Sequence, residues 1–73
     1  MPRMPILKPR EVIAGLERLG FQVARQKGSH KQFRHPDGRA TTVPDHSGRD
    51  IAPPLLRQIL KDINVPLDEF LAK

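Results

Sequence analysis

The stretch around His30 gathers the residue types that chemistry on a phosphate group requires. Histidine exchanges protons near neutral pH, glycine lets a backbone approach a ligand closely, and arginine binds phosphate oxygens in two-point contact. Around His30 the sequence places two lysines, a glycine, a serine and an arginine, namely Lys27, Gly28, Ser29, Lys31 and Arg34. This density of donors and positive charge suits a bound phosphate.

RNA cleavage is one reaction that would use these parts. It needs a base for the proton of the 2′-hydroxyl, cations for the charged phosphorane, and an acid for the leaving oxygen. No metal ion is required, because the nucleophile belongs to the substrate. Residue types alone leave two interpretations of His30 open. It is a proton-transfer group, or it is a plain surface residue on a solvated hairpin.

The other two histidines are weaker candidates. His35 precedes Pro36, and we expect it to pack at the edge of a sheet. His46 lies in the segment DHSG, where it is either part of the loop structure or a second contributor to the site. The spacing of the three histidines matches no metal-ligand pattern. The chain has no cysteine, which excludes disulfides and thiolate metal sites. We therefore expect neither a metal ion nor a cofactor.

Composition narrows the class of protein. The 73 residues predict one domain over residues 1–73, and the net charge is +5. The positive excess lies in residues 1–10 and 21–50, which indicates a nucleic-acid surface or an acidic protein partner. Three phenylalanines, with no tyrosine or tryptophan, are too few for binding by base stacking, so contact with the RNA backbone is favoured. No apolar run suits a signal peptide or membrane span, and we expect a soluble, cytoplasmic protein.

Periodicity predicts the elements that would position these residues. Apolar spacing indicates helices over residues 9–19 and 53–63, with Gly20 and Asn64 suited to end them. Alternation indicates strands from residue 21 to about 26, over 30–35 and over 39–43, joined by tight turns. A short helical turn is expected near residues 67–71. The order is α-β-β-β-α with a short C-terminal helix.

Two amphipathic helices and a half-apolar sheet predict an α+β fold, a two-layer sandwich with one sheet face open to solvent. We expect the helices to cover the face formed by Phe21, Val23, Phe33, Thr41 and Val43. Residues two apart on a strand share a face, so the opposite, open face should carry His30, Gln32 and Arg34. These three side chains would form a polar platform.

The motifs GSHKQFRHPDGR (residues 28–39), VPDHSG (43–48) and LLRQIL (55–60), with a closing EF, resemble those of the HicA-type toxins. These are small mRNA interferases of bacterial and archaeal toxin–antitoxin pairs, and the resemblance covers about residues 8–71. It implies a fold like that of double-stranded-RNA-binding domains and metal-independent endoribonuclease activity on mRNA. It also implies that His30 is the catalytic residue and that a HicB-type antitoxin is the partner.

With this resemblance we expect the toxin of a type II toxin–antitoxin system. Its proposed RNA-binding residues are Lys27, Gly28, Ser29, Lys31 and Arg34. The alternative is a non-catalytic RNA-binding module on the same fold, and a third interpretation is a small protein-interaction domain. Asp45 departs from the family pattern by placing a negative charge near the expected RNA face. Asn64, Pro53-Pro54 and Val65-Pro66 are further departures, which leave the GSH motif untouched.

Overall fold

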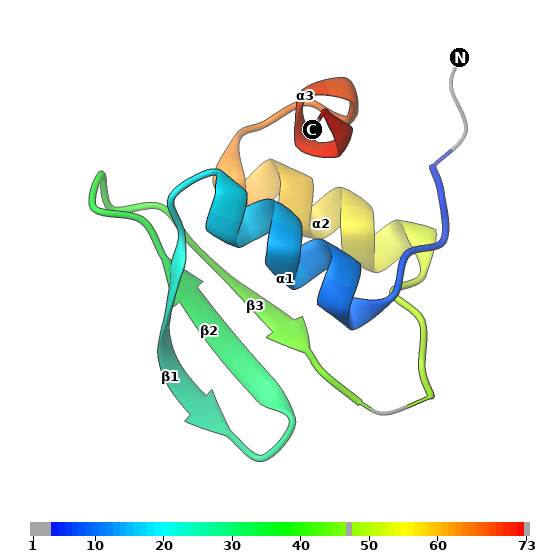
Figure 1. The fold of residues 1–73 in the computed structure, drawn as a ribbon, viewed down its shortest axis with the longest axis horizontal. Helices are drawn as coiled ribbons and strands as arrows, with labels where there is room; N and C mark the ends of the chain where they lie inside the picture. The colour runs from blue at the N-terminus through cyan, green and yellow to red at the C-terminus, as the bar shows by residue number, and fades with distance from the viewer. Residues whose placement is uncertain (1–3, 47, 73) are drawn as a thin grey trace.

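A helix, three antiparallel strands and two further helices follow one another in the computed structural model (Figure 1), which describes residues 4–46 and 48–72. The predicted α+β fold and order of elements are confirmed. The strands form one sheet in the order β1-β2-β3. The elements are α1 (Pro9–Arg18), β1 (Gln22–Lys27), β2 (His30–Arg34), β3 (Ala40–Pro44), α2 (Pro53–Ile63) and α3 (Leu67–Leu71).

The helices begin and end at the residues that favour those positions. Pro9 is at the start of α1, and the Glu11 carboxylate accepts a hydrogen bond of 2.9 Å from the Lys8 backbone N–H. Helix α1 ends at Arg18, one residue earlier than predicted, and Gly20 follows with φ +97°. Asn64 ends α2 in the left-handed conformation, with φ 56°.

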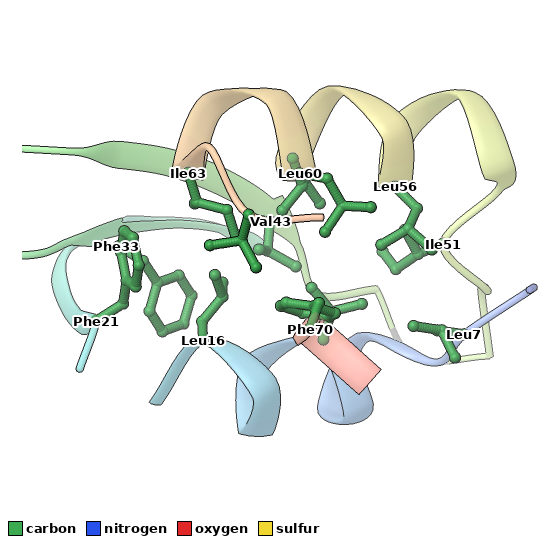
Figure 2. Close-up of a cluster of buried hydrophobic side chains, with 13 residues drawn as sticks. Leu7, Leu16, Phe21, Phe33, Val43, Ile51, Leu56, Leu60, Ile63 and Phe70 are labelled. Carbon is green, nitrogen blue, oxygen red and sulfur yellow. The ribbon is translucent and has the colours of Figure 1, made fainter. Parts of the chain in front are cut away.

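Helices α1 and α2 both pack against the sheet, mainly at β3, and together bury one of its faces. The core between the layers takes Phe33 and Val43 from the sheet, Leu16 from α1 and Ile63 from α2 (Figure 2). Helix α3 adds Phe70, whose ring packs on α1 at Gly15, where a β-carbon would come within 2.7 Å of it. None of the described helices is long and apolar enough to cross a membrane.

One prediction of burial was wrong. Val23 pairs with Phe33 across the β1–β2 ladder and so shares its face, yet Val23 is 53% exposed whereas Phe33 is buried. Strand β1 is an edge strand, and both helices pack mainly against β3 at the other edge. On this face the helices therefore bury Phe21, Phe33, Thr41 and Val43 but leave Val23 exposed.

A β-bulge between Val23 and Arg25 changes the faces of β1. Simple alternation would put Val23, Arg25 and Lys27 on one face. The bulge inserts one extra residue, so Arg25 pairs with Gln32 and Lys27 pairs with His30. Paired residues in an antiparallel ladder share a face. Both cations therefore lie on the open face of the sheet.

The turn between β2 and β3 is held by polar contacts on Asp37. Its carboxylate accepts hydrogen bonds from the backbone N–H of Arg39, at 3.0 Å, and from Arg39 Nε, at 2.8 Å. The Arg39 guanidinium also lies 5.1 Å from the centre of the Phe21 ring and donates to the Ile63 carbonyl oxygen at the end of α2. His35 packs edge-on against the same Phe21 ring, at a centroid distance of 5.0 Å.

Candidate functional site

His30 is the first residue of β2, and its side chain is exposed on the open face. Its neighbours in the flanking strands are Lys27 of β1 and Pro44 of β3. No described residue makes a hydrogen bond to its ring, so both ring nitrogens are accessible to a ligand. His30 thus combines exposure with a lysine directly opposite it in the ladder.

Gly28 and Ser29 form the two-residue turn that leads from β1 into His30. Gly28 has φ +60°, a left-handed conformation that glycine adopts at little cost, and its carbonyl oxygen accepts a hydrogen bond from Gln26 Nε2 at 3.1 Å. The Ser29 carbonyl oxygen accepts a hydrogen bond of 2.6 Å from the backbone N–H of Asp45. This bond joins the turn to the segment that leaves β3.

The same connection brings His46 to the turn. Its Nε2 lies 2.9 Å from the Ser29 hydroxyl oxygen, although the two residues are 17 positions apart. The rings of His46 and His30 meet edge to face, with centroids 6.0 Å apart and an interplanar angle of 86°. Both histidines are exposed. Ser29, His30 and His46 therefore form one cluster, which we call the histidine cluster.

The predicted phosphate-binding cations are not all in one place. Lys27 lies opposite His30, and Arg25, which the sequence analysis left out of the RNA-binding set, lies further along the same open face. Arg34 is at the far end of β2, about 13 Å from His30 at a rise of about 3.3 Å per residue. The open face thus carries a row of exposed cations beside the polar side chains of β2.

Lys31 has a different setting. It shares the face of Phe33 rather than that of His30, because the two faces alternate along β2. Its ammonium group lies 2.7 Å from a carboxylate oxygen of Asp45, and both side chains are about a third exposed, at 28% and 34%. The negative charge that departs from the family pattern is therefore paired within the chain.

A cleft of about 290 Å³ continues from His46 toward the start of α1. Its cationic lining comes from Lys8, Arg10 and Arg49, and its acidic lining from Asp45 and Asp50. These three cations lie outside the RNA-binding set predicted from the sequence. The signal that pointed to Lys8 and Arg10 was the positive excess in the first ten residues, and Arg49 belongs to the positive excess in residues 21–50.

Metal-ligating side chains are dispersed over the chain. Across residues 4–46 and 48–72, no three His, Asp or Glu side chains come together in a group that could hold a metal ion. The chemistry available at the histidine cluster is proton transfer by imidazole and anion binding by the neighbouring cations.

The sequence of residues 9–65 matches the model of a protein family described as the HicA toxin of bacterial toxin–antitoxin systems. A comparison with curated proteins gives no match. The matched residues include α1, the whole sheet and α2, and with them the histidine cluster.

Proposed function

The chain belongs to the HicA toxin family, and from this membership we propose that it is an endoribonuclease that cleaves mRNA with His30 as its catalytic residue. As the toxin of a type II toxin–antitoxin pair, it arrests growth by removing messages. The cleavage needs no metal ion or cofactor, because the 2′-hydroxyl of the RNA is the nucleophile.

One observation carries this proposal. His30 is exposed on the sheet face that the helices leave uncovered, opposite Lys27 and next to the Gly28-Ser29 turn. An RNA backbone that crosses this face can bring a 2′-hydroxyl within hydrogen-bond reach of the imidazole, about 2.6–3.2 Å. His35, by contrast, is only partly exposed and packs against the Phe21 ring.

The surrounding groups would bind the phosphates on either side of the cleaved bond. Lys27 supplies charge next to His30, and Arg34 supplies a planar fork further along the strand. The Gly28-Ser29 turn would let the RNA backbone come close to the sheet, since the space beside the Gly28 α-carbon is open. Lys31 contributes less than these two cations, because Asp45 already pairs with its charge.

The partner that we propose is a HicB-type antitoxin. Such a protein would neutralise the toxin by binding it and keeping mRNA from the open face. The net charge of +5 favours an acidic surface on that partner as well as the RNA itself.

The decisive experiment compares wild-type protein with His30→Ala on end-labelled RNA in the presence of a chelator. We expect wild-type cleavage and a loss of about 10²–10⁴-fold in the variant, the usual contribution of a general acid–base group. RNA binding should be retained. A matched RNA with 2′-deoxy nucleotides should bind and remain intact, because it lacks the nucleophile.

The control variant is His35→Ala, which removes a histidine that packs on Phe21. It should lower the melting temperature and leave the cleavage rate per folded molecule unchanged. If His30→Ala cuts RNA at the wild-type rate, the catalytic assignment fails. RNA binding without any cleavage by wild-type protein would favour a non-catalytic RNA-binding module instead.

A further inference from the structure

We propose that His46 is the second proton-transfer group of the site, the general acid, and that Ser29 is the residue that positions it. This inference rests on the proposed ribonuclease function and adds to it. One histidine accounts for only one of the two proton transfers in RNA cleavage. The leaving 5′-oxygen needs a proton as well.

The distances in the histidine cluster fit two groups that act on one phosphodiester. Each imidazole reaches a substrate oxygen at about 2.6–3.2 Å, and the centroids of the two rings are 6.0 Å apart. Both rings are exposed, so one phosphate group placed beside the two rings can contact both of them. No other described histidine lies near, since His35 is in the turn at the opposite end of β2.

His46 is held in place although it lies in a loop. The Ser29 hydroxyl group is hydrogen-bonded to its Nε2 at 2.9 Å. Its neighbour Asp45 is tied twice, by the backbone bond to Ser29 at 2.6 Å and by the ion pair with Lys31 at 2.7 Å. Three contacts that link this loop to the start of β2 orient the ring toward the site of His30. A positioned proton donor requires such support.

The hydrogen bonds in the cluster accommodate this assignment of roles. A charged imidazole donates from both nitrogens. In His46, Nε2–H can donate to the Ser29 oxygen while Nδ1–H remains for the leaving oxygen. The ring of His30 makes no hydrogen bond to a described residue and can present a neutral nitrogen as the base.

The proposed step is balanced. Neutral His30 takes the proton of the 2′-hydroxyl, and the oxygen lone pair forms the new bond to phosphorus. The bond from phosphorus to the 5′-oxygen breaks, its electron pair stays on that oxygen, and charged His46 donates a proton to it. The products are a 2′,3′-cyclic phosphate and a 5′-hydroxyl. His30 then returns its proton to water and His46 takes one up.

The experiment uses an RNA in which sulfur replaces the leaving 5′-oxygen at one position. A thiolate leaves without a proton, because thiols have a pKa of about 8.5 and are far stronger acids than alcohols. We expect His46→Ala to lose about 10²–10⁴-fold on ordinary RNA and to approach the wild-type rate on the sulfur RNA. His30→Ala should be slow on both.

Two further variants separate chemistry from structure. His46→Gln keeps an N–H group for Ser29 but cannot transfer a proton, so it should be as slow as His46→Ala on ordinary RNA. Ser29→Ala should be slow on ordinary RNA and near wild type on the sulfur RNA, and Ser29→Thr, which keeps the hydroxyl, should recover ordinary cleavage.

Two results would overturn the inference while leaving the proposed function intact. In the first, His46→Gln cuts ordinary RNA like wild type while His30→Ala does not, which makes His46 a structural residue. In the second, His46→Ala is equally slow on both RNAs, which excludes it as the acid. If wild-type protein cuts neither RNA, the ribonuclease function itself fails, and this inference fails with it. Because His46 is exposed, thermal melts should show every His46 variant folded.

Discussion

The ammonium group of Lys31 lies 2.7 Å from a carboxylate oxygen of Asp45, and this ion pair joins β2 to the loop after β3. The pair is partly exposed, so its contribution to stability should be small, about 0.2–1 kcal/mol. Its larger effect is on charge, because Asp45 offsets one lysine beside the proposed RNA-binding face.

Asp45→Asn should therefore tighten RNA binding. The change removes a negative charge and releases Lys31, which can then contact a phosphate. We expect the slope of log affinity against log salt to become steeper by about 0.7–0.9, measured by salt titration with labelled RNA in a His30→Ala background. Lys31→Ala should have little effect alone but should cancel the gain in the Asp45→Asn protein. An unchanged affinity in Asp45→Asn would contradict this account of the pair.

Lys27→Ala and Arg34→Ala should each weaken RNA binding. Both residues are exposed on the open face, and each lost phosphate contact should lower the salt slope by about 0.7–0.9. The matched control is Arg57→Ala, an equal change of charge at an exposed position of α2, on the covered side of the sheet. Equal losses from all three variants would show that binding depends on net charge alone, with no role for the open face.

Phe33→Ala should remove most of the stability of the protein. Phe33 is 1% exposed, and truncation of a buried phenylalanine costs about 3–5 kcal/mol, a large part of the stability of a small domain. Val23→Ala, on the same face but 53% exposed, should cost far less. Chemical denaturation of the two variants measures this difference, and similar losses would show that β1 is covered in solution.

Gly15→Ala should loosen the packing of α3. The added methyl group would lie 2.7 Å from the Phe70 ring, and such overpacking costs about 1–3 kcal/mol. The gain of about 0.5–1 kcal/mol from alanine in a helix offsets part of that cost. In a double-mutant cycle, Phe70→Leu should reduce the penalty of Gly15→Ala. If the effects of the two substitutions are additive, the contact between Gly15 and Phe70 is not the cause of the lost stability.

Asp37→Asn should destabilise the protein at neutral pH but not at acidic pH. The backbone N–H of Arg39 is the main cause that lowers the pKa of the Asp37 carboxyl group, and the Arg39 side chain adds to it. A lowered pKa in the folded state gives stability above the unfolded value of about 3.9, and this stability is lost as the pH falls through the folded value.

The measurement for Asp37 is the melting temperature as a function of pH. The gap between wild type and Asp37→Asn should be present at neutral pH and should close below about pH 4. Asp50→Asn is the control, since Asp50 makes no ion pair within the described chain, and it should show no such gap. A gap that persists at low pH would mean that the turn depends on side-chain shape rather than charge.

Periodicity predicted the helices and strands because the apolar spacing and the turn residues indicate the same element boundaries. Pro9, Gly20 and Asn64 occur where their backbone preferences are used, so the element ends were nearly correct. The predicted burial of Val23 was wrong because of tertiary structure. Whether an apolar edge residue is buried depends on how far the helices extend over the sheet, and alternation along a strand carries no information about that.

The candidate site was predictable in part. His30 and its turn are adjacent in the sequence, so one motif identifies them. The contact of Ser29 with His46 depends on a backbone bond between the turn and the loop after β3, and no local pattern encodes it. The face of Arg25 and Lys27 depends on a bulge, which inserts a residue without an obvious sequence signal.

The bulge in β1 also has a consequence for association between molecules. An edge strand presents unpaired N–H and C=O groups, and a regular edge strand with an exposed valine such as Val23 would invite a second chain to add to the sheet. The bulge interrupts the regular spacing of those groups and increases the local twist. Arg25 and Lys27 add like charges that repel another copy of the same edge. The bulge that places Arg25 and Lys27 on the open face therefore also protects the protein from edge-to-edge aggregation.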